Sequence, residues 1–223
     1  MRPFLILSGI VNALCVSVLI LFVGVQISSF GMWFYRWQFD VNQIYAQVNM
    51  EQRDLHEVTR HMIRYMRGQE PDLQIMALVG GEVRPFFSDI EIRHMVDVYD
   101  LFAVGFILQY VTIGLLLFTS ALFFFMPRNR QHLFKAWQIT AALIFSLFGV
   151  LVASIAANWD HAFIVFHEIF FDNNYWQLNP RVDLLVNIVP HEFFFTLSIF
   201  IGVFFAAGLA LLFLISTLLL RKK

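Results

Sequence analysis

Four long apolar stretches, separated by polar segments, set the pattern of this chain. None of the four contains Asp, Glu, Lys or Arg, and each exceeds the roughly 20 residues that an α-helix needs to cross the hydrocarbon core of a bilayer. The pattern predicts an all-α membrane protein with four transmembrane helices. We place these helices at residues 4–30, 101–126, 136–158 and 193–220.

The charges of the polar segments predict how the chain crosses the membrane. Segment 127–135 is short and carries three basic residues and no acid, which is typical of a cytoplasmic loop. Arg2 and the tail 221–223 are also basic, whereas all sixteen Asp and Glu residues fall in segments 31–100 and 159–192. We therefore expect both termini in the cytoplasm and the two acidic segments outside the cell.

The first acidic segment is too long for a simple connection, and its pattern predicts a small α+β cap. A capping-box pattern at Asn49 and Gln52 precedes an apolar stripe, so we expect an amphipathic helix that ends at Gly68. The stripe consists of Leu55, Val58, Met62 and Met66. Segments 73–79 and 82–87 flank two consecutive glycines, which is typical of a β-hairpin.

A second capping box, Ser88 with Glu91, predicts that the helix of the second span begins outside the membrane. Glu91, His94 and Val98 then share one face of this helix. The second acidic segment also combines histidine, acid and aromatic residues, in the stretch 166–176. Both acidic segments therefore place histidine, acidic and aromatic side chains, the candidates for a functional site, close to the lipid interface.

The composition of the spans and segments excludes several functions. Because both acidic segments carry net negative charge, the chain lacks a basic surface for nucleic acid, and we expect no nucleic-acid partner. The spans contain no ionisable residue other than Cys15 and tyrosines, which disfavours transport along a charged pathway. We expect Cys15 to act as a small apolar residue.

A metal centre is also not expected. His167 and Glu168 begin as the HExxH zinc motif does, but Phe171 occupies the fifth position. A site built from His161, His167 and His191 would lack the usual spacing of zinc ligands. We therefore expect neither a metal nor another cofactor.

Five short motifs lie in or beside the acidic segments. They are residues 91–98 (EIRHMVDV), 166–171 (FHEIFF), 176–180 (WQLNP), 183–185 (DLL) and 193–194 (FF). Together they resemble the lipoprotein intramolecular transacylase family, whose members are four-span membrane proteins of Gram-positive bacteria. The resemblance implies a multi-pass protein of the bacterial plasma membrane, with an extracellular cap and an extracellular active site.

The activity that this resemblance implies is acyl transfer within one bacterial lipoprotein. The substrate would be a diacylated lipoprotein among membrane lipids. Its sn-2 acyl chain would move to the amine of its own N-terminal cysteine, so no acyl-CoA would be needed. The two catalytic histidines of the family match His94 and His167 of this sequence, and imidazole can both take and give a proton near neutral pH.

Other residues near the two histidines are candidates for supporting roles. As hypotheses, Glu91 or Asp97 orients His94, and Glu168 or Asp172 tunes His167. The aromatic side chains expected to hold acyl chains are Phe166, Phe170, Tyr175 and Trp176. The candidate donors to a developing oxyanion are Asn174 and Tyr175.

Two other functions fit the same topology. A non-enzymatic envelope scaffold or lipid-binding accessory protein would tolerate the replacement of both histidines. A metal-dependent membrane hydrolase would lose activity with chelators and would release free fatty acid. The transacylase differs from both, since it needs the histidines and keeps the acyl chain on the lipoprotein.

Overall fold

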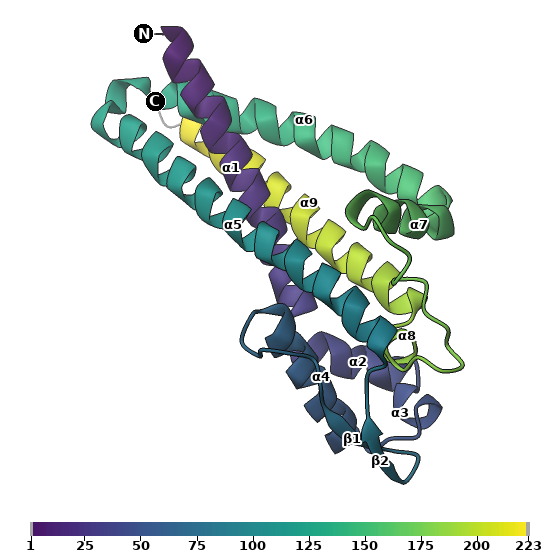
Figure 1. Ribbon diagram of the computed structural model, residues 1–223. Coiled ribbons are helices and arrows are strands. Elements are labelled where there is room, and N and C mark those ends of the chain that lie inside the picture. Colours follow the sequence, from purple (N-terminus) through teal and green to yellow (C-terminus); the bar gives the residue numbers. More distant parts are fainter. Residues whose placement is uncertain (1, 222–223) are drawn as a thin grey trace. The chain divides into compact units, whose positions relative to one another are not determined.

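The structure of the protein is a computed structural model that describes residues 2–221 (Figure 1). In chain order its elements are α1 (Arg2–Ser29), α2 (Met32–Val41), α3 (Ile44–Gln47), α4 (Gln52–Met66), β1 (Met76–Val79), β2 (Glu82–Pro85), α5 (Asp89–Phe125), the 3-10 helix η1 (Pro127–Asn129), α6 (Arg130–Ala157), α7 (Trp159–Phe170), α8 (Leu185–Ile188) and α9 (His191–Arg221). They form two compact units: a span unit (residues 2–25, 106–158 and 199–221) and a polar unit (Gln26–Gly105 and Trp159–Ser198).

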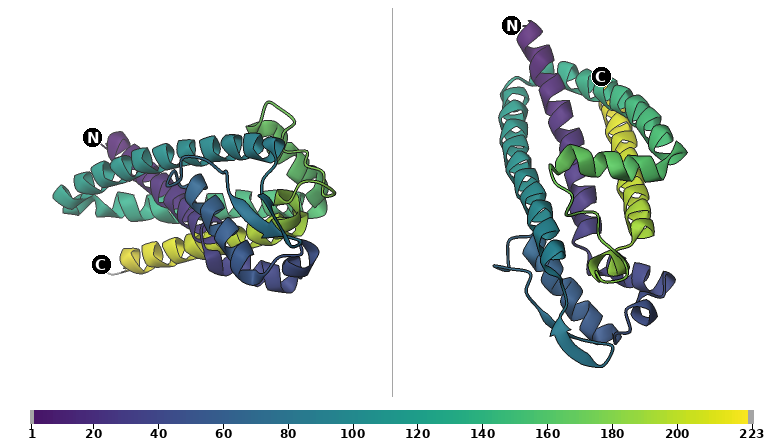
Figure 2. Two further views of the ribbon diagram at one scale, coloured as in Figure 1. Left: turned by 60° about the horizontal axis from the view of Figure 1, so that its bottom comes forward. Right: turned by 45° about the vertical axis from the view of Figure 1, so that its right-hand side comes forward.

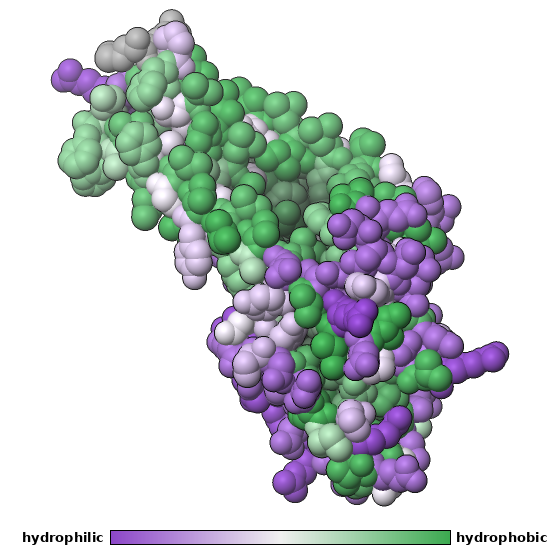
Figure 3. All heavy atoms as spheres, viewed as in Figure 1, coloured by the Kyte–Doolittle hydropathy of each residue, from purple (hydrophilic) through white to green (hydrophobic). Residues whose placement is uncertain are grey.

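The span unit consists of the long parts of α1, α5, α6 and α9, which are long and apolar enough to cross a membrane. Large apolar side chains such as Leu117, Phe118 and Leu147 are 62–71% exposed on these helices, and Figure 3 shows this apolar surface in green. Such exposure would be costly in water but suits contact with lipid chains. The expectation of four membrane-crossing helices is confirmed.

The start of α1, the α5–α6 connection and the end of α9 lie at one end of the span unit (Figures 1 and 2). Leu5 of α1 packs with Phe123 and Leu133, which lie on either side of the connection. Gln138, near the start of α6, donates a hydrogen bond to Thr217 near the end of α9, at 3.0 Å. The basic residues of the connection and of the end of α9 therefore share one end.

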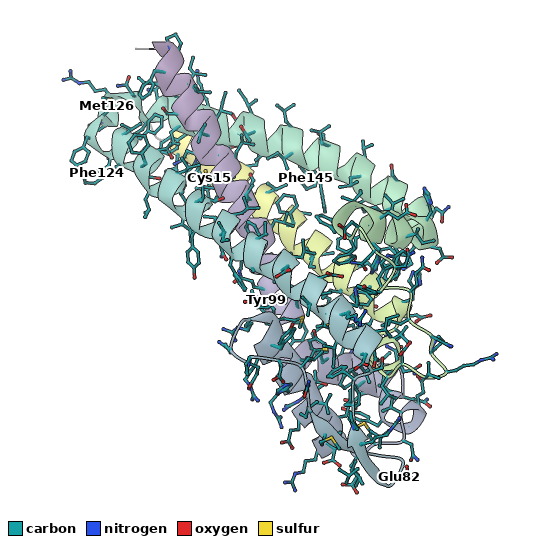
Figure 4. The ribbon with its side chains drawn as sticks, viewed as in Figure 1. Cys15, Glu82, Tyr99, Phe124, Met126 and Phe145 are labelled. Atoms are coloured by element: carbon teal, nitrogen blue, oxygen red, sulfur yellow. The ribbon has the colours of Figure 1, made fainter. Side chains whose placement is uncertain are left out.

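A buried polar network joins three of these helices. Asn12 of α1 is fully buried, and its amide nitrogen donates to Thr119 and Ser120 of α5, both at 2.9 Å. Its amide oxygen accepts a 2.8 Å hydrogen bond from Trp137 of α6. Cys15, one turn further along α1, is buried and unpaired, as expected for a small apolar residue (Figure 4).

The polar unit contains the amphipathic helix and the hairpin that the sequence predicts. All four residues of the predicted stripe on α4 are buried, and the chain leaves this helix through Gly68 at φ +69°. The strands β1 and β2 pair antiparallel on either side of Gly80 and Gly81, which adopt φ values of +63° and +88°. These left-handed values suit a two-residue hairpin turn and cost glycine little.

One expected cap does not form. The residue before α4 is Glu51, and no side chain caps the helix there. Asn49 instead adopts φ +50°, and its carbonyl accepts a 3.0 Å hydrogen bond from Gly80 in the hairpin turn. The expected capping box of Asn49 with Gln52 is therefore wrong. Asn49 instead lies in the turn after α3, and its carbonyl bonds to the hairpin turn.

The core of the polar unit joins elements that are far apart in the sequence. Phe34 and Phe39 of α2, Leu55 of α4 and Ile188 of α8 are each at most 1% exposed. Phe193, in the first turn of α9, packs its ring 5.2 Å from that of Phe34. Burying several large side chains in one cluster stabilises the unit and gives its two polar segments a common core.

We predict that Asn12→Ala weakens the span unit by about 1–2 kcal/mol, since hydrogen bonds between membrane helices are each worth roughly 0.6–2 kcal/mol. Thermal unfolding in detergent would measure the loss as a lower midpoint. Ser17→Ala is the matched control, because Ser17 is also buried on α1 but, among the described residues, its hydroxyl donates within its own helix, to the backbone oxygen of Ala13. An Asn12→Ala midpoint equal to that of Ser17→Ala would contradict the prediction.

Candidate active site

The start of α5 fixes the first side of the site. Ser88 and Glu91 form the predicted capping box, because the Ser88 amide donates to the Glu91 carboxylate at 2.6 Å and the Glu91 amide donates to Ser88 Oγ at 3.5 Å. The other oxygen of Glu91 accepts a hydrogen bond from the backbone amide of Leu185. Ser88 Oγ also donates to the buried carboxylate of Asp183, at 2.9 Å. These contacts attach the 183–185 turn to the head of α5.

His94 lies one turn further along α5, in the polar extension of this helix. At 1.5 Å per residue the helix is about 55 Å long, well beyond a hydrocarbon core of about 30 Å. Its first twelve residues carry five charged side chains and precede the charge-free stretch. His94 is 9% exposed, and its Nδ1 atom has no hydrogen-bond partner among the described residues.

His167 approaches from α7. It is 7% exposed, and its Nδ1 atom lies 2.7 Å from the backbone oxygen of Phe163, one turn earlier. A carbonyl oxygen only accepts hydrogen bonds, so Nδ1 carries the proton. In the neutral ring Nε2 therefore keeps its lone pair and is free to accept a proton.

The two imidazole rings lie close together inside the polar unit. Their centroids are 6.1 Å apart, and their planes are inclined by 34°. Phe171 borders both rings, at 5.3 Å from His94 and 5.6 Å from His167. Trp176 stacks on His167 at 4.6 Å with planes inclined by 29°. Aromatic side chains therefore shield a site that presents two imidazoles.

The loop after α7 is attached to α5 on both sides of His94. Asn173 donates a 2.9 Å hydrogen bond to Asp97, and the Arg93 guanidinium lies 5.6 Å above the ring of Tyr175. Arg93 precedes His94 directly, and Asp97 follows it by about one helical turn. The loop that supplies Trp176 to one histidine is thus tied to the helix that carries the other.

The acidic residues expected to support the histidines have other partners or none. Glu91 is fully buried, but its oxygens bond to backbone amides rather than to His94. Asp97 bonds to Asn173 and acts on His94 through its charge alone. Glu168 and Asp172 are exposed, and neither forms a hydrogen bond or ion pair with His167 in the part of the chain described.

Only one of the expected substrate-binding residues packs face to face with a histidine. Trp176 stacks on His167, whereas Tyr175 contacts Arg93. Phe166 and Phe170 are 46% and 50% exposed and lie against one another, and Phe166 also meets His167 edge-on at 5.5 Å. Asn174 is exposed. The structure therefore leaves most of this set on the surface beside the histidines.

The histidines considered as a metal site do not come together. His191 lies edge-on to Phe163 at 4.6 Å, and its Nδ1 atom is 3.7 Å from the carboxylate of Asp160. Within residues 2–221, no group of three or more His, Cys, Asp and Glu side chains is arranged to hold a metal ion. The aromatic ring of Phe163 lies beside both His191 and His167.

The sequence interpretation missed three residues that shape the site: Phe163, Phe171 and Asn173. Phe163 lies four residues before His167, so helical spacing on the same face could have identified it. Phe171 lies four residues after His167, so the same helical spacing applies to it. Asn173 bonds to a residue 76 positions earlier, and local pattern carries no signal for such a contact.

Burial keeps both imidazoles uncharged near neutral pH. It lowers the pKa of His94 to about 4, with a smaller contribution in the same direction from His167 and an opposing one from Asp97. Burial also lowers the pKa of His167, although the hydrogen bond to the Phe163 carbonyl favours its charged form; the nearby His191 lowers this pKa further. Two neutral imidazoles can act as proton acceptors.

Four helices of bilayer length and a buried pair of imidazole rings characterise the chain as a membrane protein with a candidate acid–base site. The model of the family described as lipoprotein intramolecular transacylase Lit matches residues 10–194. The chain belongs to this family and is an acyltransferase that is integral to the membrane.

Solved structures share this fold. The lipoprotein intramolecular transacylase Lit from Bacillus cereus superposes with a TM-score of 0.83 over 100% of this chain and 99% of its own, at 20% identity. Two variants of that protein, with a histidine replaced by arginine or by alanine, give TM-scores of 0.77 at 21% and 20% identity. They cover 97% of this chain and 92% and 94% of theirs. No curated protein matches the chain.

We predict that the stability of the protein falls as the pH is lowered from about 6.5 towards about 4. The unfolded chain binds a proton at His94 over this range, whereas the folded chain does not, so unfolding takes up protons. Thermal unfolding from pH 7 to pH 4.5 would show a smaller decrease for His94→Gln than for the wild type.

His61→Gln is the control for this measurement, because His61 is only half-buried on α4 and its ring lies 3.1 Å from the backbone oxygen of Asp72. Its pH dependence should match that of the wild type. Parallel curves for the wild type and His94→Gln would contradict the argument from burial.

Proposed function

We propose that the protein moves the sn-2 acyl chain of a diacylglyceryl lipoprotein to the α-amine of that lipoprotein's N-terminal cysteine. The product is an N-acyl lyso-form lipoprotein. The observation that carries this proposal is the pair of buried imidazoles with ring centroids 6.1 Å apart. Membership of the transacylase family supports the substrate class.

The reaction forms one bond and breaks one bond within a single substrate molecule. The amine nitrogen attacks the ester carbonyl, a tetrahedral intermediate forms, and the bond from the acyl carbon to the sn-2 oxygen breaks. The amine loses a proton and the departing oxygen gains one, so no external group is consumed. The attack closes a ring of about eight atoms, which is entropically unfavourable without a site that holds the substrate folded.

We assign to His167 the removal of the proton from the amine. The tautomer set by the Phe163 carbonyl leaves Nε2 of His167 as the acceptor atom. Once protonated, this ring is a ready donor, because burial disfavours its charged form. His94 is close enough to relay the proton to the departing oxygen or to hydrogen-bond the tetrahedral intermediate.

Apolar surroundings support the same chemistry. Trp176 and Phe171 border the rings and keep water from competing with the amine. We propose that the exposed faces of Phe166 and Phe170 contact acyl chains of the substrate. Asn174 and Tyr175 are the proposed donors to the oxyanion, since both lie on the loop that follows α7.

We also propose that the termini face the cytoplasm of a bacterium and that the histidines face the outer surface of its plasma membrane. The support is the charge pattern: Arg128, Arg130 and Arg221 gather at one end of the span unit, and basic loops are retained on the cytoplasmic side. The polar unit, which carries every Asp and Glu, would then meet lipoproteins after their export.

The test is mass spectrometry of N-terminal lipopeptides from a host that lacks its own lipoprotein N-acylation. Expression of this chain should move one acyl group to nitrogen at unchanged total mass. His94→Ala and His167→Ala should each lower the N-acylated fraction by about 100-fold or more, since acid–base groups contribute roughly 10²–10⁴-fold. His61→Ala, a change at a half-buried histidine of α4, should leave the product unchanged.

Unmodified diacylglyceryl peptides in the presence of well-expressed protein would overturn the proposal. Free fatty acid with loss of acyl mass from the lipopeptide would point to hydrolysis instead.

A further inference from the structure

One side chain outside the histidine pair contacts the surroundings of both histidines. Asn173 follows α7 by three residues, and its amide nitrogen donates to Asp97 of α5 at 2.9 Å. Its amide oxygen accepts from the backbone amide of Tyr175, also at 2.9 Å. Its backbone oxygen accepts from the indole nitrogen of Trp176 at 3.1 Å. A single asparagine thus uses three polar atoms to shape this loop.

Each of these contacts leads to one of the histidines. Asp97 lies about one turn beyond His94 on the same rigid helix. Trp176 stacks on the His167 ring. The backbone oxygen of Asn173, which bonds to the indole nitrogen, therefore also helps to orient the surface on which this imidazole stacks. Asn173 therefore connects the helix of one imidazole, through Asp97, to the indole that stacks on the other imidazole.

We propose that Asn173 is a positioning residue for acyl transfer, which fixes the separation of the two imidazoles through Asp97 on one side and Trp176 on the other. This inference rests on the proposed transacylase reaction. Asn173 touches no histidine itself, so its contribution is geometric. Misplacement of reacting groups by about 1 Å can lower a rate by roughly 100-fold, which makes such a connection important for turnover.

The chemistry of the Asp97–Asn173 pair allows a sharp test. Asn173→Ala removes the donor to Asp97 and the acceptor for Tyr175. Asn173→Asp keeps the acceptor but places two carboxylates against one another, which costs free energy when both are charged. Combining Asn173→Asp with Asp97→Asn exchanges the amide and the carboxylate, so one hydrogen bond can form again in the reverse direction.

The first arm measures turnover with a diacylated lipopeptide in detergent or lipid. We expect Asn173→Ala and Asn173→Asp to lower kcat by about 10- to 100-fold with a smaller change in KM, because the reacting groups are misplaced while lipid binding persists. The exchanged double variant should recover most of the kcat lost in Asn173→Asp.

The control for a purely structural effect is Asn187→Ala. Asn187 lies in the same polar segment and donates two hydrogen bonds of 2.8 Å, to the backbone oxygens of Pro180 and Asp183, but contacts neither histidine. This variant should lose thermal stability to a similar extent as Asn173→Ala while keeping its kcat. An equal loss of kcat in both variants would overturn the proposal.

The second arm needs no catalysis, so it separates this inference from the proposed reaction. A protonated histidine quenches the fluorescence of a stacked indole, and subtracting the signal of Trp176→Phe isolates the contribution of Trp176. The wild type should show quenching as the pH falls. Asn173→Ala should reduce it, because the loop that carries the backbone oxygen bonded to Trp176 loses its side-chain bonds to Asp97 and Tyr175. Absence of N-acyl product from the wild type, with this quenching difference intact, would refute the reaction but not the positioning.

Two results would overturn the positioning role. One is wild-type quenching in Asn173→Ala, which would show that Trp176 keeps its place without the side chain of Asn173. The other is an exchanged double variant that is no more active than Asn173→Asp, which would show that the Asp97 contact has no bearing on turnover.

Discussion

The burial of two imidazole rings beside one another is the constraint on which the rest of the polar unit depends. Water would hydrate each ring and favour its charged form in mild acid, whereas burial keeps both rings neutral. Two neutral rings can lie with centroids 6.1 Å apart without electrostatic repulsion. The aromatic residues that border them supply this dry environment, and His167 satisfies its own N–H within its helix.

The carboxylates near the site act mainly through the backbone. Glu91 and Asp183 are both buried, and their oxygens accept hydrogen bonds from the amides of Ser88, Leu185 and Asn179. Burial raises the pKa of Glu91, and the amide donors oppose this shift. Their effect is to hold the loop that precedes α9 against the head of α5. The helix that carries His94 therefore also carries Glu91, whose oxygens bond to backbone amides.

The span unit solves a different physical problem. Its helices expose large apolar side chains, so water provides no driving force for their association in lipid. Hydrogen bonds between helices contribute to this association instead: Asn12 bonds to partners on α5 and α6, and Gln138 bonds to Thr217 on α9. Polar side chains such as Asn12 and Gln138 thus join helices within the span unit, while both histidines of the candidate site lie in the polar unit.

The sequence by itself determined the features that depend on local pattern. Apolar length predicted the four spans, the two glycines predicted the hairpin turn, and the Ser88–Glu91 spacing predicted the start of α5. The family motifs indicated His94 and His167 as candidates. Each of these signals extends over one turn or one element, where spacing along the chain fixes neighbours in space.

Only the tertiary structure decided which side chains complete the site. Glu91 meets Leu185 across 94 positions, and Asn173 meets Asp97 across 76. On α7, Phe163 is half-buried beside His167, whereas Phe166 is 46% exposed, because packing within the polar unit, not helical period alone, selects the buried side. Such contacts arise when separate elements fold onto a common core, and no local pattern of residues encodes which partner each will meet.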